Sequence, residues 1–246
     1  MATPRKKPVP RREALSRGAI AEAALALIGA RGLDALSMRK LGEALGVEAM
    51  ALYHHFPSKG ELLDAVMDRL VDEMDQPDAA GATPLQRLRR YISDWRGLAL
   101  RHPRAFPLLA MRRFNSPRSF AMYERILAAF ADAGLPPERA AGWFRLIGGF
   151  ATGSGLAEVA SRELVSDATP LQLQHAPDRV AFPHVRAAAP HLRVDQLDKV
   201  FRFGLDVLFD ALAREIAALG RPVATAAGKK PPGAPRRRAA TAKSRA

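Results

Sequence analysis

The sequence of 246 residues contains no cysteine, which excludes disulfide bonds and thiolate metal sites. It also lacks any apolar run of the roughly 20 residues that a transmembrane helix needs. The basic first twelve residues are not followed by the apolar core of a signal peptide. We therefore expect a soluble, cytoplasmic protein with no membrane partner.

Acidic residues are absent from both ends of the chain. Residues 1–12 carry five Lys and Arg and residues 220–246 carry eight, which together account for the formal net charge of +13. The segment from Glu13 to Asp75 has eleven Asp and Glu against six Lys and Arg. The composition of the two ends predicts a disordered basic arm (1–12) and a disordered basic tail (220–246). Runs of Lys and Arg suit non-specific contact with nucleic-acid phosphates, a role that we favour for the arm; for the tail, this role and plain solvation remain equal alternatives.

Strand-like alternation of apolar and polar residues is also missing, so the sequence predicts an all-α fold. We expect a first helix from the N-cap Ser16 to Arg31, and a later helix from Lys59 to about Asp75. A linker at 76–83, rich in Pro, Gly and Ala, should separate two domains at 13–75 and 84–219. Residues 166–194 contain four prolines and no lasting period, which predicts a loop or a poorly ordered segment.

The most informative stretch is 36–66, LSMRKLGEALGVEAMALYHHFPSKGELLDAV. Ser37 should cap a short helix, which Gly46 ends by adopting a left-handed conformation. A second short helix is stopped by a proline. Ser58 should cap the next helix and form a capping box with Glu61. This order of elements predicts a helix-turn-helix.

A glycine turn alone also suits a generic helical hairpin, so the whole string carries the identification. It closely resembles the DNA-binding segment of the TetR family of one-component repressors. The family pattern is matched without gaps by Ser37, Arg39, Leu41, Leu45, Gly46, Val47, Leu52, Tyr53, His55, Phe56, Lys59, Leu62 and Leu63. The resemblance implies an N-terminal three-helix domain with a helix-turn-helix and a C-terminal helical domain for ligand binding and dimerisation. It also implies a repressor that binds a palindromic double-stranded DNA operator as a homodimer and is released by a small, apolar effector.

Few side chains of a recognition helix can reach base edges. The candidates for base contacts are Arg39, Glu48, Ala49, Met50 and His54. By the family resemblance, those for phosphate contacts are Ser37, Tyr53, His55 and Lys59. Arg39 suits a bidentate contact to guanine, whereas Tyr53 has packing as an alternative role. The adjacent histidines do not predict a metal site, because no third ligand lies nearby in the sequence.

By the same resemblance, segments 137–165 and 195–219 should form the homodimer interface. The first contains a cluster of small residues: Gly142, Gly148, Gly149, Gly153, Ser154 and Gly155. Because each helical glycine costs about 0.5–1 kcal/mol, the cluster indicates close approach of another helix. The second segment is apolar on two sides, which are Phe201, Leu205, Leu208, Leu212 and Ile216, and Val200, Phe203, Val207 and Ala211. We expect glutamate at Leu205 and Leu212 to yield monomers.

The resemblance further implies a small-molecule pocket in the second domain. The candidate ligand-binding residues are Tyr91, Trp95, Phe106, Leu109, Arg112, Trp143 and Ile147, with Phe114 and Phe144 beside them. This lining suits a hydrophobic or aromatic effector, and Arg112 or Arg113 is placed to meet an anion; each aromatic residue has the core as an alternative place. Tetracycline-binding members hold a metal-bound drug with histidines, and Leu109 falls where one of these lies. Magnesium–tetracycline is therefore not expected, and neither a cofactor nor a metal ion is predicted.

Two other function classes are less compatible with the sequence. An enzyme is disfavoured because no nucleophile–base pair, phosphate loop or metal cluster appears in the sequence. Ser154, which lies between two glycines, is expected within a helix rather than on the strained turn that a serine nucleophile occupies. A non-specific, architectural chromosome-binding protein is the stronger alternative, since its basic tails would look similar. Only a repressor would keep a large preference for one palindrome.

Overall fold

The computed structural model describes residues 15–74, 80–112, 114–164 and 182–220. All regular elements in these ranges are helices, so the predicted all-α fold is confirmed. The basic arm (1–12), the first half of the linker (76–79), Asp75, Arg113, the first part of the predicted loop and all but the first residue of the basic tail lie outside the described residues. No described helix has the length and continuous apolar character that crossing a bilayer requires.

The N-terminal helices are α1 (Arg17–Arg31), the 3₁₀ helix η1 (Leu33–Ala35), α2 (Met38–Leu45), α3 (Ala49–Tyr53) and α4 (Lys59–Asp72). The hydroxyl groups of Ser16, Ser37 and Ser58 accept hydrogen bonds from backbone N–H groups three residues ahead, at 3.1–3.2 Å. These are the predicted N-caps. The reciprocal bond that we expected from Glu61 is not formed.

The turn between α2 and α3 depends on two glycines. Gly46 ends α2 with a φ of 67°, a left-handed conformation that glycine adopts without a steric penalty. Gly42 lies where α2 meets the start of α3, and a Cβ atom there would be 2.8 Å from the carbonyl oxygen of Val47. Beneath this turn, the fully buried Leu41, Leu52 and Phe56 form the small core of the helix-turn-helix.

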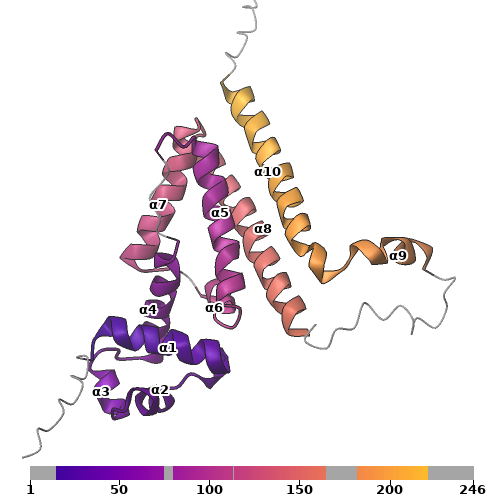
Figure 1. Cartoon of the computed structure of the whole chain (residues 1–246). Coiled ribbons are helices and arrows are strands. Elements are labelled where there is room, and N and C mark those ends of the chain that lie inside the picture. Colours follow the sequence, from indigo (N-terminus) through magenta and orange to yellow (C-terminus); the bar gives the residue numbers. More distant parts are fainter. Residues whose placement is uncertain (1–14, 75–79, 113, 165–181, 221–246) are drawn as a thin grey trace, which may run out of the picture.

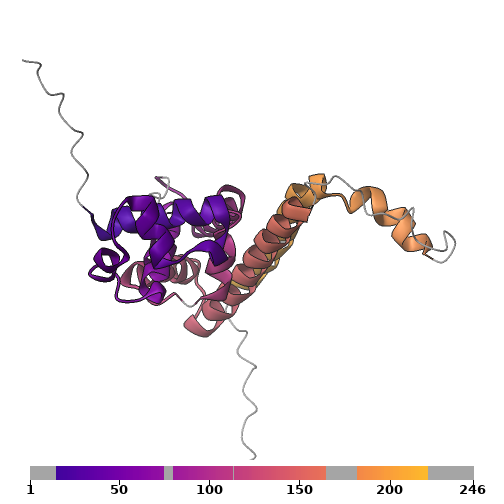
Figure 2. The same cartoon turned by 90° about the horizontal axis from the view of Figure 1, so that it is seen from below.

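The second half comprises α5 (Pro84–Arg101), α6 (Phe106–Met111), α7 (Pro117–Asp132), α8 (Pro137–Leu164), α9 (Pro183–Ala188), η3 (Ala189–His191), η4 (Val194–Gln196) and α10 (Leu197–Leu219). Helix α5 packs between α7 and α8, and α10 runs beside α8 (Figure 1). Figure 2 shows α9 projecting away from these helices. The expected loop at 166–194 is therefore wrong for 183–194: Pro183 begins α9 and Pro190 lies in the first turn of η3, where proline is tolerated because the first N–H groups of a helix have no partner within it.

A buried arginine joins three of these helices. Arg96 on α5 contacts Glu158 of α8 at 2.7 Å and Asp198 of α10 at 2.8 Å. Its guanidinium also lies 4.7 Å from the ring centre of Phe201. A charge is tolerated in this buried position because opposite charges and hydrogen bonds surround it.

The two apolar sides of α10 have different environments. Phe201, Leu205 and Leu212 are buried within the chain, whereas Val200, Phe203 and Val207 are exposed. The choice of Leu205 and Leu212 as interface residues was therefore wrong. The 3.6-residue period shows that a helix has two apolar sides, but it does not show which side the same chain covers.

Four of the glycines of α8 also differ in their environment. A Cβ atom at Gly155 would lie 2.6 Å from the ring of Phe106, so close packing within the chain accounts for this glycine. A Cβ atom at Gly142, Gly149 or Gly153 would meet nothing within 4 Å. These three glycines are exposed on the same face of α8 as Leu146, and packing within the described chain does not explain them.

Candidate functional site

The helix-turn-helix presents one accessible surface. On α3, Met50 and Tyr53 are 67% and 41% exposed, and His54 is exposed directly after the helix. Large apolar and aromatic side chains with this exposure do not contribute to the local core. They are accessible for contacts with DNA.

The other predicted DNA-contacting residues lie around α3. Arg39 is exposed and paired with Glu43 one turn along α2, an exposed pair of the kind that contributes little to stability. Glu48 precedes α3 and its side chain makes no capping bond, while Ala49 and His55 are half-buried. Lys59 begins α4, and Ser37 uses its hydroxyl as an N-cap. Sequence reasoning missed Arg17, which donates to the carbonyl oxygen of His55 and stacks on Phe56 at 4.1 Å.

A second group of polar contacts joins α4 to the helices behind it. Asp64, Asp68 and Asp72 are spaced four residues apart, so they lie on one side of α4. Arg112 donates to Asp64 at 2.6 Å and to the carbonyl oxygen of Gly60 at 3.2 Å.

Further contacts continue this row toward the end of α4. Ser116 donates to Asp68 at 2.5 Å, and Arg118 pairs with Asp72. Beyond them, Glu73 contacts His102 at 2.7 Å and Arg101 at 3.0 Å. The acidic surplus noted at 13–75 therefore serves in part to hold α4 against the second half of the chain.

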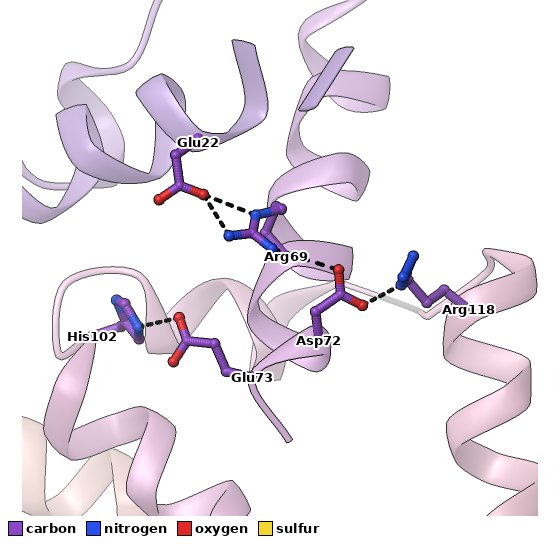
Figure 3. Close-up of polar contacts among 6 residues, drawn as sticks. All are labelled: Glu22, Arg69, Asp72, Glu73, His102 and Arg118. Atoms are coloured by element: carbon purple, nitrogen blue, oxygen red, sulfur yellow. Dashed lines mark hydrogen bonds and ion pairs between the residues drawn. The ribbon is translucent and has the colours of Figure 1, made fainter. Parts of the chain in front are cut away.

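Figure 3 shows the part of this group around Arg69, which binds Glu22 of α1 while the neighbouring Asp72 binds Arg118 of α7. The hydrogen bond from Arg69 to Glu22 is the main cause that raises the pKa of this guanidinium. Arg104 also donates to the carbonyl oxygens of Gly29 and Ala30, at 3.2 and 2.6 Å, at the C-terminal end of α1 where a cation is favourable. Helices α1 and α4 are thus both tied to the second half of the chain.

The second half contains a cavity of about 350 Å³ between α5, α6, α7 and α8. Four aromatic rings in its wall follow one another edge to face or tilted: Trp95 and Phe114 at 5.8 Å, Phe114 and Tyr123 at 6.0 Å, and Tyr123 and Phe144 at 5.3 Å. The indole N–H of Trp95 donates to the hydroxyl of Thr152 at 3.1 Å. A mostly apolar cavity with a few polar groups is the usual form of a small-molecule site.

The structure places the candidate ligand-binding residues in two groups. Trp95, Leu109 and Ile147 line the cavity, as do Phe114 and Phe144. The other four lie elsewhere. Tyr91 and Phe106 are buried in the core, Arg112 binds Asp64, and the indole N–H of Trp143 donates to Glu215 of α10 at 2.9 Å.

Sequence reasoning missed several residues of the cavity wall: Leu88, Ile92, Met122, Tyr123, Ile126, Phe130, Arg145 and Thr152. Those on α5, α7 and α8 recur at helical spacing, which is the signal that could have located them. In the described ranges, no group of three or more His, Asp or Glu side chains is arranged to hold a metal ion.

The end of α6 and its connection to α7 contact both regions in turn. Leu109, Ala110 and Phe114 line the cavity, while Arg112 and Ser116 bind carboxylates of α4. One short stretch of chain therefore forms a cavity wall and the attachment of α4.

Comparison with known proteins gives matches over most of the chain. Residues 20–66 match the family described as bacterial regulatory proteins, tetR family, and residues 77–216 match the tetracyclin repressor-like C-terminal domain. The tetracycline repressor protein class G of Vibrio anguillarum is 30% identical, over 83% of this chain and 97% of that protein. An HTH-type transcriptional regulator of Saccharopolyspora erythraea is 32% identical, but the match spans only 49% of this chain and 51% of that relative.

Among solved structures, the TetR family protein ActR of Streptomyces coelicolor in complex with actinorhodin is similar in fold. The TM-score is 0.70 at 26% identity, covering 82% of this chain and 97% of ActR. The two sequence relatives named here are a transcriptional regulator and a repressor.

Proposed function

The chain belongs to the TetR family of bacterial regulatory proteins, and we propose on this premise that it is a ligand-responsive repressor. In this proposal it binds a palindromic DNA operator as a homodimer in the cytoplasm, has no catalytic activity, and releases the DNA when a small molecule occupies its cavity. The observation that carries the proposal is the stretch from Leu109 to Ser116, whose residues alternate between the cavity wall and α4.

The DNA-contacting part of the proposal rests on exposure and position. Helix α3 enters the major groove, where Met50, Ala49 and His54 reach base edges. Arg39 leaves its exposed pair with Glu43 to contact a guanine, because such a pair contributes at most about 1 kcal/mol. Lys59, Tyr53 and the main-chain N–H groups at the start of α4 bind phosphates.

The homodimer in this proposal forms through the faces of α8 and α10 that their own chain leaves open. On α8 this face carries Gly142, Leu146, Gly149 and Gly153, and on α10 it carries Val200, Phe203 and Val207. Glycines without side chains allow the helix backbone of a partner to come close. Because the two-fold axis repeats both faces, four helices form the interface.

Release of DNA follows from the attachment of α4. A ligand that packs against Trp95, Leu109 and Phe114 moves the wall formed by α6 and the start of α7. Arg112 and Ser116 transmit this movement to Asp64 and Asp68 of α4. The two recognition helices of the dimer then no longer match successive major grooves, which lie about 34 Å apart.

Selection from a random DNA library tests the proposal and identifies the operator in the same experiment. The purified protein should enrich a palindrome with two half-sites and bind it at least about 10³-fold more tightly than a random duplex of equal length at physiological salt. Enrichment of no palindrome, with equal binding to all duplexes, would refute a repressor and favour the architectural alternative.

A further inference from the structure

We propose that the cavity takes a planar aromatic anion, a compound of two or three fused or linked rings that carries one acidic group. This inference rests on the proposed function, because it names the chemical class of the ligand that the cavity would sense.

The size and walls of the cavity set the apolar part of the ligand. An empty apolar cavity of about 150 Å³ holds one benzene ring, so the volume of about 350 Å³ found here has room for two to three rings. Trp95, Phe114, Tyr123 and Phe144 offer ring faces and edges at several inclinations. Flat aromatic groups gain from such offset and edge-to-face contacts beyond simple burial.

The polar groups of the wall are unevenly distributed between donors and acceptors. Arg145 on α8 lines the cavity, is exposed, and has no ion-pair partner among the described residues. No Asp, Glu, His or Lys belongs to the cavity lining in the described part of the chain. A guanidinium donates only, and its geometry matches two oxygen atoms of an anion. A cationic ligand would meet repulsion here with no acid to offset it.

Tyr123 adds a second donor to the wall of the same cavity. Its ring lies 5.3 Å from the ring of Phe144, the residue that precedes Arg145, and its hydroxyl makes no hydrogen bond within the described residues. Burial raises the pKa of the Tyr123 phenol, so the hydroxyl remains protonated at neutral pH and is able to donate. The indole N–H of Trp95 is already committed to Thr152. Arg145 and the hydroxyl of Tyr123 are therefore donors for acceptor oxygens of a ligand, and no carboxylate of the described wall opposes a negative charge.

Two fluorescent probes with the same aromatic skeleton separate the charge from the rings. We would use 8-anilino-1-naphthalenesulfonate, which is an anion, and N-phenyl-1-naphthylamine, which lacks the sulfonate. In a Trp143→Phe background, Trp95 is the single tryptophan, so quenching of its emission reports binding beside it in the cavity.

We expect Arg145→Gln to weaken binding of the sulfonate probe about tenfold. The affinity for the uncharged probe should change less than about twofold. Tyr123→Phe should weaken the sulfonate probe by a smaller factor. Arg31→Gln, which removes one exposed positive charge from the end of α1, is the matched control for net charge and should change neither probe. Raising the salt concentration from about 0.1 to about 1 M should reduce the difference between the affinities of the protein for the two probes.

The results distinguish this inference from the function beneath it. If both probes quench Trp95 but Arg145→Gln affects them equally or not at all, the anion selectivity is refuted and a ligand-sensing cavity still stands. If neither probe quenches Trp95, the cavity is not a ligand site, and both proposals about it are overturned.

Discussion

Replacing Arg112 by methionine should reduce the effect of ligand on DNA binding more than it reduces either binding event alone. Methionine keeps an unbranched apolar chain but loses the guanidinium. The lost contacts are two hydrogen bonds to Asp64, at 2.6 and 3.1 Å, and one to the carbonyl oxygen of Gly60 at 3.2 Å.

The expected loss of coupling follows from the exposure of the Arg112–Asp64 ion pair. The side chains of Arg112 and Asp64 are 34% and 47% exposed, so solvent screens their attraction and the contact stays near the upper end of the range for surface pairs, about 1 kcal/mol. That corresponds to about a fivefold change in an equilibrium constant. Coupling between two sites is typically about 1–3 kcal/mol, so this single contact would account for a third or more of it.

Fluorescence anisotropy of the selected operator, with and without the naphthalene probes, measures the coupling directly. The factor by which probe weakens DNA binding should fall about fivefold in Arg112→Met, and the same loss must appear in probe affinity measured with operator present. Arg89→Met is the matched control, because Arg89 forms a similarly exposed ion pair with Asp206 that joins α5 to α10 away from α4. An unchanged coupling factor in Arg112→Met would show that the signal does not pass through this contact.

Three further predictions concern the dimer, the operator and acid stability. Phe203→Glu should yield folded monomers that lose operator affinity, because Phe203 is 70% exposed within the chain; an unchanged mass in sedimentation equilibrium would exclude this face. Arg39→Ala should reduce the preference for one base pair of the operator and cost about 1–3 kcal/mol of binding free energy, whereas Lys59→Ala should weaken binding to all DNA sequences alike and lower the slope of its salt dependence by about one. If Arg39→Ala instead weakened binding equally to all point-mutated operators, Arg39 would be a phosphate contact. Hydrogen bonds from Arg139 and then Trp143 lower the pKa of Glu215, so its contribution to stability is complete above the ordinary pKa and is lost as pH falls through the lower folded-state value. Glu215→Gln should remove that part of the acid dependence in unfolding followed by circular dichroism, and an identical pH profile would contradict the assignment.

The sequence predicted best what neighbouring residues determine together. Ser16, Ser37 and Ser58 cap helices, and Gly46 ends one, because each of these features involves residues three or four positions apart. The exposed Met50 and Tyr53 follow from the same local pattern. These features were enough to locate the helix-turn-helix.

Contacts between distant segments could not be predicted in this way. Arg112 was expected in the cavity and instead binds Asp64, 48 residues away. Arg145 lines the cavity although its sequence neighbourhood looks like an ordinary polar position on a helix. On α10, the period revealed two apolar sides, but only the packed chain distinguishes the buried Leu205 from the exposed Phe203. The incorrect predictions therefore concern which distant segment of the chain each helix face contacts.

The row of carboxylates on α4 also gives the helix the properties of a lever. Asp64 and Asp72 are eight residues apart, about 12 Å along the axis, and the helix of 14 residues is about 21 Å long. A displacement of about 1 Å at one anchor, with the other fixed, tilts the rod by about 5° and moves its far end by about 2 Å. In the proposed dimer, symmetry doubles this change in the separation of the two recognition helices, to about 4 Å, which exceeds the tolerance of a hydrogen bond. Under the proposed mechanism, a movement of the cavity wall by about 1 Å would therefore be enough to disrupt binding to DNA.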